Sequence, residues 1–285
     1  MLKASNWLVI TLSLLVIAQV SPSAAQTPEV KANQQRMQYD VYAGGIHALQ
    51  AKLDMDLSKQ DRFDVNLWAQ TYGLLGKLAP WSGTFESHGW KGQTNKPEIH
   101  KSTATWRGEK EIKQYSYAKD GKFLEYRLTD DENDGSPRAV DDELTQNTSD
   151  VLTATLNTMQ AIAGGSECEG ETEIFDGKRR YKLIFKQKKE VMLEASRYNV
   201  YAGPAMECTA EVEPIAGKWH DKPRGWLSIQ EQGRELGKIP TVWFAQMVEG
   251  QPAVPVKVLV KTSYGTLFMH MTDYAGGNKK LTLKD

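Results

Sequence analysis

The feature that most constrains the fold of this chain is a period of two among its apolar residues. Apolar side chains alternate with polar or charged ones in many runs, among them 53–57, 63–70 and 254–261. Successive residues of a β-strand point to opposite faces, so each run describes a strand with one buried face and one solvated face. Such strands favour an antiparallel sheet, because parallel strands are usually buried on both faces.

Two Asp-Gly pairs mark turns between these runs. Asp120-Gly121 separates IKQYSYAK from KFLEYRL, and Asp176-Gly177 separates ETEIF from KRRYKLIF. Asp-Gly is a strong hairpin signal because both residues tolerate the positive φ that tight turns require. The sequence therefore predicts β-hairpins over 111–129 and 171–187.

One stretch has the period of an α-helix instead. We predict an amphipathic helix over 149–163, with Thr148 or Ser149 as its N-cap and Gly164-Gly165 at its end. The residues of its buried face recur at spacings of three, four and seven: Leu144, Val151, Leu152, Thr155, Leu156, Met159, Ile162 and Ala163.

Three other segments are less regular. A short helical turn is predicted at 73–78, where Pro80 prevents its continuation. The acidic stretch 130–143 is expected to be a solvated loop. The segment 226–238 stays open between helix and loop.

The N-terminal segment has the layout of a secretory signal peptide. Lys3 precedes an apolar run of 14 residues from Trp7 to Val20, and Ser23-Ala24-Ala25 supplies the small residues for cleavage after Ala25. The alternative is a membrane anchor, but a spanning helix needs roughly 20 residues. We predict a signal peptide over 1–25, and no other stretch is long and apolar enough to span a membrane.

The sequence thus predicts a mainly β protein. Residues 26–285 form a single domain, because no linker or internal repeat divides them. Its architecture is a strongly curved antiparallel sheet, or open barrel, that encloses the principal helix 149–163.

Export makes the two cysteines informative. Cys168 and Cys208 both follow the predicted signal peptide, and a pair of cysteines in an oxidising compartment is most simply one disulfide. The alternatives are a metal pair, which needs further ligands nearby, and a redox pair, which usually has the spacing Cys-x-x-Cys.

Composition and motifs exclude several functional classes. A chain with 25% charged residues and a net charge of −1 is not collagen-like, low in complexity or strongly basic, and we expect no nucleic-acid partner. No catalytic, phosphate-binding or zinc motif is present: GRELGK at 233–238 has the wrong spacing for a phosphate loop, and the five histidines are scattered. We expect no cofactor and no catalytic residues.

The acidic stretch resembles a calcium loop only in part. Asp130, Glu132 and Asp134 fall at ligand positions, but Asp141 stands where a bidentate Glu is expected. Pro137 also argues against this site. A flexible acidic loop is the competing interpretation.

A basic stretch follows the second hairpin turn: Lys178, Arg179, Arg180, Lys182, Lys186, Lys188 and Lys189. One interpretation is a patch for anionic lipid headgroups. The other is a solvated strand in which Asp176 pairs with an arginine. Adjacent residues of a strand face opposite ways, so Arg179 and Arg180 cannot share a single basic face.

Several segments resemble a family of uncharacterised exported proteins from Gram-negative bacteria, defined only as a domain of unknown function. These are YDVYAGGIHALQAKLDM near the mature start, FDGKRRY at 175–181, YAGPAMEC at 201–208 and PIAGKW at 214–219. The resemblance covers about 38–272, and the acidic stretch is not associated with the family. It implies a periplasmic protein of unassigned biochemistry, and it supports the bridge between Cys168 and Cys208.

A second similarity is at the level of the fold. The predicted architecture resembles periplasmic proteins whose curved sheet wraps helices, such as lipoprotein carriers. Tryptophan is frequent after the signal peptide, and these side chains either line an apolar cavity or fill a core. Our candidate contacts for an apolar ligand are Trp68, Tyr72, Leu74, Trp81, Leu152, Leu156 and Met159.

These observations predict a non-catalytic periplasmic protein of envelope maintenance that binds an apolar or lipidic ligand. The first alternative is a structural or adaptor protein that binds an envelope protein through a sheet edge or the acidic loop. The second is a hydrolase whose carboxylates meet in space without a sequence motif.

Overall fold

The strands of this protein form one continuous antiparallel sheet. A computed structural model describes residues 32–219, 226–235, 237, 239–262 and 265–283, so the predicted signal peptide lies outside the described residues. In the first half of the chain the strands are β1 Gln34–Ala43, β2 Ile46–Asp56, β3 Arg62–Thr71, β4 Trp81–Trp90, β5 Lys96–Trp106, β6 Glu109–Tyr117, β7 Phe123–Thr129 and β8 Asp134–Arg138. In the second half they are β9 Gly170–Phe175, β10 Arg179–Leu193, β11 Gly203–Gly217, β12 Thr241–Ala245, β13 Val254–Thr262, β14 Gly265–Gly276 and β15 Lys279–Thr282.

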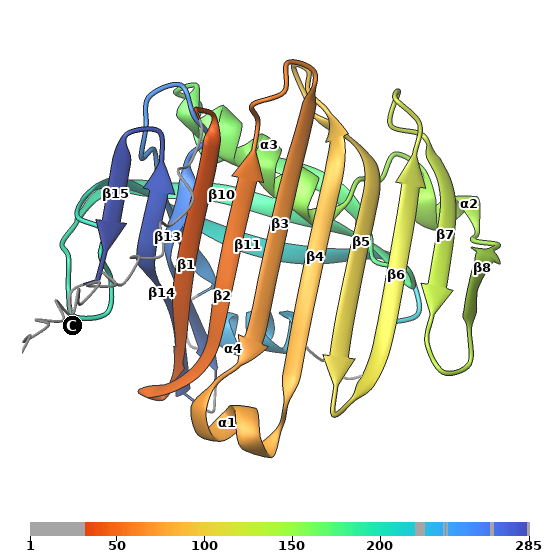
Figure 1. Ribbon diagram of the computed structural model, residues 1–285, viewed down its shortest axis with the longest axis horizontal. Coiled ribbons are helices and arrows are strands. Elements are labelled where there is room, and N and C mark those ends of the chain that lie inside the picture. Colours follow the sequence, from red (N-terminus) through yellow and green to blue (C-terminus); the bar gives the residue numbers. More distant parts are fainter. Residues whose placement is uncertain (1–31, 220–225, 236, 238, 263–264, 284–285) are drawn as a thin grey trace, which may run out of the picture.

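The strand order runs from β8 through β7, β6, β5, β4, β3, β2 and β1 to β14, and then through β13, β12, β11 and β10 to β9. Figure 1 shows β1–β7 as a front layer, with α3 (Val151–Ala163) behind it and with β10 and β11 crossing farther back. The sheet therefore curls around α3. This confirms the predicted mainly β fold with an open, curved antiparallel sheet.

The two ends of the sheet approach each other through side chains. Phe175 at the end of β9 packs against Tyr115 of β6 and Tyr126 of β7, with ring centroids 5.4 and 5.9 Å apart. No backbone pairing joins β9 to β7 or β8 among the described strands. The barrel stays open, and a buried aromatic cluster fills the gap at this point.

Both predicted hairpins are confirmed. β6 and β7 meet at Gly121, and β9 and β10 meet at Gly177, and each of these glycines has a φ of 92°. The helices are α1 Gly73–Leu78, α2 Asp142–Thr145, α3 and α4 Trp226–Glu235. The predicted α1 is confirmed, and the segment that the sequence left open is mostly helical.

The predicted helix 149–163 is confirmed as α3, but the predicted N-cap is wrong. Ser149 still belongs to the sheet, because its N–H donates to the Glu173 carbonyl at 2.8 Å. The cap is Asp150, whose carboxylate accepts from the N–H groups of Leu152 and Thr153. At the other end Gly165 takes a φ of 85°, as the sequence predicts for a C-terminal glycine.

The acidic stretch is not simply a loop, which corrects that prediction. Asp134–Arg138 forms the edge strand β8 beside β7, and Asp142–Thr145 forms α2. Arg127 of β7 donates to the Gly135 carbonyl, which helps to hold the edge strand. An edge strand can carry charged residues because its side chains remain in solvent. Most residues of β8 are exposed, so the strand pairs with β7 without burying a carboxylate.

Candidate functional site

Helix α3 covers only one half of the concave face of the sheet. Along the inner face of β3, Phe63 and Val65 are buried, whereas Leu67, Ala69 and Thr71 are partly exposed. The inner face of β5 shows the same gradient, from buried His100 through partly exposed Ser102 and Ala104 to exposed Trp106. The concave face therefore lies open toward the end of the sheet where β3 ends and β4 begins.

The N-terminus of α3 is fixed to the inner face of the sheet by a buried polar cluster. The Ser87 hydroxyl of β4 donates to the Asp150 carboxylate at 2.6 Å and lies 2.7 Å from Nδ1 of His100 on β5. The Thr153 hydroxyl donates to the other carboxylate oxygen at 2.6 Å. One carboxylate thus caps the helix and ties it to two strands.

The electrostatics of this cluster favour an ionised carboxylate. Burial by itself would raise the pKa of Asp150, but His100 and the hydrogen bonds from His100, Ser87 and Thr153 together lower it to about 2. The cluster differs from a nucleophilic triad, in which the two histidine nitrogens contact serine and carboxylate separately. Here Ser87 and Asp150 both lie on the Nδ1 side of His100.

The turn between β4 and β5 holds the middle of α3. The Asn95 N–H donates to the Asn157 side-chain oxygen at 2.9 Å, and the Asn95 amide also contacts Gln160. These contacts close the end of the concave face opposite the open half.

An apolar pocket of about 450 Å³ lies in the concave face beside α3. The front strands, α3 and the rear strands all contribute to it, and none of its lining residues is charged. Its walls are Tyr39, Ala51, Leu53, Val65, Leu67 and Phe85 from β1–β4; Val151, Leu152, Thr155 and Met159 from α3; and Phe185, Ala210, Pro240, Thr241, Val242, Phe244, Pro255, Val258 and Met269 from the rear of the sheet.

The structure brings only part of the predicted contact set to this pocket. Leu152 and Met159 line it, and Leu156 is fully buried on the same helix. Trp81 lies on the inner face of β4, four residues from Phe85 in the direction of the open end. The contact of these four residues with a ligand stays a prediction.

The other three candidates lie away from the pocket. Trp68 is on the outer face of β3, where the Lys52 ammonium lies 5.4 Å from its ring centroid, because even-numbered residues of this strand point outward. Tyr72 and Leu74 lie at and beyond the end of β3 and are exposed. Trp68, Tyr72 and Leu74 therefore do not line the apolar pocket beside α3, contrary to the predicted cavity.

Most of the lining was missed because it comes from strands far apart in the sequence. Phe85, Phe185 and Phe244 each belong to an alternating or buried run, which marks them as inward-facing. Alternation does not tell which inward-facing residues oppose one another across a curved sheet. That information comes only from the strand order.

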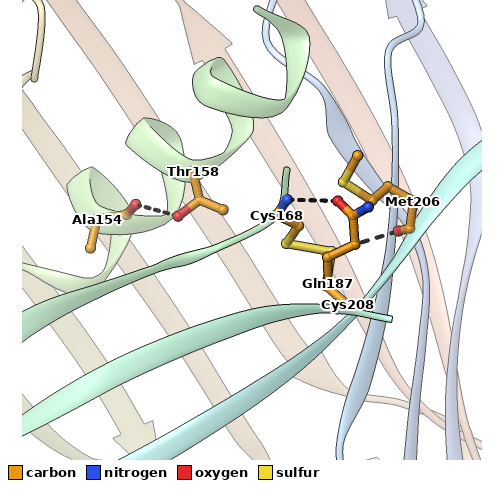
Figure 2. The surroundings of a disulfide bond; sticks show 6 residues. All are labelled: Ala154, Thr158, Cys168, Gln187, Met206 and Cys208. Atoms are coloured by element: carbon orange, nitrogen blue, oxygen red, sulfur yellow. Dashed lines mark hydrogen bonds between the residues drawn. A yellow bond between two sulfur atoms is a disulfide. The ribbon is translucent and has the colours of Figure 1, made fainter. Parts of the chain in front are cut away.

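The predicted disulfide is confirmed. Cys168 and Cys208 are joined with their Cα atoms 6.2 Å apart, and both are fully buried. Figure 2 shows Gln187 beside the bridge, where its side-chain oxygen accepts from the Cys168 N–H at 3.0 Å. The bridge therefore fastens the loop after α3 to β11, and the hydrogen bond to Gln187 joins it to β10.

Both arginines of the basic stretch are paired with carboxylates, as one of the two sequence interpretations states for Asp176. Arg179 contacts Asp176 with two N–O distances of 2.6 and 2.8 Å, and Arg180 contacts Glu173 at 2.8 Å. Asp176 lies in the turn between β9 and β10, and Glu173 lies in β9. Their charges are therefore partly neutralised within the protein.

Two findings concern metals and membranes. Among the described residues, no group of three His, Cys, Asp or Glu side chains is placed to hold a metal ion. In the same part of the chain, no helix combines the length and the apolar character that crossing a membrane requires.

Comparison with known proteins gives a family and a fold. The curated proteins contain no match to this chain. A crystal structure of a beta-barrel-like protein of domain of unknown function DUF1849 from Brucella abortus is similar, with a TM-score of 0.52 and 9% identity over 87% of this chain and 100% of that chain. This likeness concerns the fold alone. The model of the family described as "Protein of unknown function (DUF3108)" matches residues 38–272, and the chain belongs to that family.

Proposed function

We propose that this protein binds an apolar or lipidic ligand within the cell envelope and does not catalyse a reaction. The observation that carries the proposal is the apolar pocket of about 450 Å³ between α3 and the curved sheet. Pockets for small ligands usually measure about 300–1,000 Å³ and are mainly apolar. This pocket falls within that range.

The chemistry of the lining selects the part of a ligand that it would hold. An uncharged wall offers nothing to compensate the desolvation of a phosphate or carboxylate headgroup. A hydrocarbon chain has no polar groups to desolvate when it enters such a pocket, and its transfer out of water is favourable in free energy. The bound part is therefore an alkyl or acyl chain, and a charged headgroup would stay outside.

The location in the envelope is supported by the sequence and by the disulfide. The predicted signal peptide 1–25 directs export, and buried disulfides such as Cys168–Cys208 persist in oxidising compartments. Cell fractionation with N-terminal sequencing tests this part. A periplasmic protein that begins at Gln26 is the expected result, and an uncleaved cytoplasmic chain would contradict it.

We propose that the protein is not an enzyme because the residues best suited to catalysis have a structural role. Ser87, His100 and Asp150 are all buried and bind the N-terminus of α3 to the sheet. Their hydrogen bonds are used within the protein. A reaction catalysed by the purified protein and abolished by Ser87→Ala in a folded variant would overturn this part.

Ligand binding is tested by filling the pocket. Ala210 lines the pocket, so Ala210→Trp places an indole ring in it, while Ala202→Trp on an exposed loop serves as the matched control. A fluorescent apolar probe should bind to the wild type and to Ala202→Trp. Ala210→Trp should bind it at least about tenfold more weakly, which corresponds to ~1.4 kcal/mol.

Two checks make this test decisive. Val258→Trp enters the same pocket from β13 and should have the same effect if Ala210→Trp fails to fold. Native mass spectrometry of protein purified from the periplasm should show a bound lipid mass in the wild type. Equal probe binding in all folded variants would contradict the proposal.

A further inference from the structure

The two ends of the front layer of strands differ in chemistry. At one end lie the turns β2–β3, β4–β5 and β6–β7, at the top of Figure 1. Their exposed residues are glycine or polar: Ser58, Lys59, Gln60, Asp61, Gly92, Gln93, Thr94, Lys96, Lys119, Asp120 and Lys122. This end is an ordinary solvated surface.

The other end is apolar over β1–β6 and acidic beyond them, where the β7–β8 turn carries Asp130, Asp131 and Glu132. The turns β1–β2 and β5–β6 lie there together with α1, at the bottom of Figure 1. Its large exposed aliphatic and indole side chains are Ile46, Leu74, Leu75, Leu78 and Trp106, which we call the apolar tip, and exposed Tyr72 lies beside them. Leu74 is 62% exposed and Leu78 67%, and α1 buries none of its residues.

The leucines of the apolar tip are exposed although their helix is firmly held. The Tyr72 N–H donates to the Ala48 carbonyl at 2.8 Å, and the Thr71 hydroxyl accepts from the Trp81 N–H at 2.9 Å. The same hydroxyl donates to the Ala79 carbonyl at 3.1 Å. Both ends of α1 are thus anchored through polar groups, while Leu74 and Leu78 remain mostly exposed.

The segments of the apolar tip are also joined to one another. The Arg107 N–H donates to the Pro80 carbonyl at 3.1 Å, which binds the β5–β6 turn to the segment after α1. The His47 and Tyr72 rings lie with centroids 4.2 Å apart, which joins the β1–β2 turn to the start of α1. The tip is therefore one preformed surface.

The segments that form the apolar tip carry more bases than acids, although the β7–β8 turn at the same end is acidic. Residues 43–48, 72–81 and 105–110 contain the bases Lys77, Arg107 and Lys110 and the single acid Glu109. Trp81 and Trp106 are cross-strand neighbours at the same place. Tryptophan, exposed leucine and basic residues together are the composition of surfaces that sit in the headgroup layer of an anionic membrane.

The open half of the concave face points toward this tip. Between the apolar pocket and the apolar tip, the inner face carries Ala69, Thr71 and Trp81, all partly exposed. Helix α3 and Asn95 close the opposite direction. An alkyl chain leaving the pocket would therefore emerge beside the leucines of α1.

We propose that the apolar tip docks on an anionic lipid bilayer surface, with Leu74 and Leu78 inserted among the headgroups. Lys77 and Arg107 would face the anionic lipids. The docking itself requires no bound ligand, while its use as a transfer route between bilayer and pocket rests on the proposed function.

A bilayer fits this surface better than a second copy of the chain. In a two-fold dimer the same patch faces itself, so the three bases of each copy would meet three further bases and only one further acid, Glu109. An anionic bilayer supplies the opposite charge and an apolar layer in one partner.

The test is flotation of the full mature protein with vesicles. We expect it to float with vesicles of phosphatidylcholine mixed with phosphatidylglycerol, and less with pure phosphatidylcholine. Lys77→Gln and Arg107→Gln should each weaken binding to the mixed vesicles by about fivefold. Binding should weaken further as the salt concentration rises.

The structure offers a matched control for the leucines. The double variant Leu74→Ser/Leu78→Ser should lose flotation, whereas Leu124→Ser should keep it, because Leu124 is 60% exposed but lies in β7 next to the polar β6–β7 turn. Leu74→Ser/Leu78→Ser should still bind the apolar probe in vesicle-free buffer. Ala210→Trp should lose the probe and still float, so failure of the pocket and failure of docking are distinguishable.

Three results would overturn the inference. The first is a wild-type protein that floats with neither kind of vesicle. The second is equal flotation of Leu74→Ser/Leu78→Ser and the wild type. The third is a wild-type dimer in sedimentation analysis that Leu74→Ser/Leu78→Ser converts to a monomer, which would assign the apolar tip to a second copy.

Discussion

The carboxylate of Asp150 satisfies several donors at the point where α3 meets the sheet. It accepts from two N–H groups of the helix and from the hydroxyls of Ser87 and Thr153. A buried carboxylate remains charged only when such contacts exceed the cost of desolvation. The position of the helix, and with it one wall of the pocket, depends on this residue.

Asp150→Asn should lower the free energy of unfolding by about 3 kcal/mol at neutral pH, because the neutral amide binds these donors more weakly. The folded pKa of Asp150 is about 2, below its ordinary value of 3.8. Its contribution is thus fully present above about pH 4 and is lost as the pH falls toward 2. Urea unfolding between pH 2 and 7 measures this.

The control for Asp150 is Asp130→Asn. Asp130 also has a lowered pKa, caused first by the Asn133 side chain, but it caps a turn on the surface. A much smaller change in stability is expected there. The assignment fails if Asp150→Asn keeps the same acid-induced loss of stability as the wild type.

Gly177 and Gly121 occupy equivalent turns but differ in their surroundings. Both have a φ of 92°, where alanine costs about 1–2 kcal/mol. A Cβ at Gly177 would lie 3.0 and 3.1 Å from the hydroxyls of buried Tyr126 and Tyr115, whereas at Gly121 it would meet only the flexible Lys96 side chain. Gly177→Ala should therefore destabilise more than Gly121→Ala in chemical denaturation. Equal losses of stability in the two variants would show that the tyrosine side chains move aside with no energetic penalty.

At the scale of elements, the disulfide fixes the loop between α3 and β9. Cys168 and Cys208 are 40 residues apart in sequence, and the bridge attaches this loop to the rear strands. The helix is consequently held at both ends, by Asp150 at its start and by the bridge beyond its end.

Cys168→Ser should lower the free energy of unfolding by about 4 kcal/mol, because the unfolded chain regains the freedom of a loop of that length. Reduction of the wild type should produce a similar loss. The measurement is denaturant unfolding with and without a reductant, and Cys168→Ser/Cys208→Ser shows whether a lone thiol adds an effect of its own. Free thiols that titrate in the native wild-type protein would rule out the bridge.

Elements with a local cause could be predicted from the sequence. The two Asp-Gly hairpins, α1 and α3 follow from turn residues and apolar periods within single segments. The edge strand Asp134–Arg138 was missed because its composition is that of a loop, and its structure comes from the neighbouring strand β7. The cap of α3 was missed by one residue because Ser149 pairs with the sheet.

At the scale of the whole molecule, one continuous sheet surrounds a shared core. Buried residues of the front strands, α3 and the rear strands belong to the same apolar cluster, including Met37, Phe63, Leu156, Phe244 and Met271. The front and rear layers therefore bury their inner faces against each other and against the helix.

The protein should unfold in a single cooperative transition, because neither layer retains a buried face without the other. Scanning calorimetry should give a calorimetric enthalpy equal to the van't Hoff enthalpy. Two separated transitions would contradict this and would divide the predicted single domain.

The sequence by itself determined the fold class, the principal helix, the hairpins, the disulfide pair and the family. These depend on periodicity, on turn chemistry and on residues counted along one chain. The tertiary structure decided which inner faces oppose one another, how far α3 covers them and where the apolar pocket opens. The physical reason is that alternation assigns a side chain to a face, as it does for Phe85 and Phe185, but the curvature and strand order of the sheet decide what that face meets.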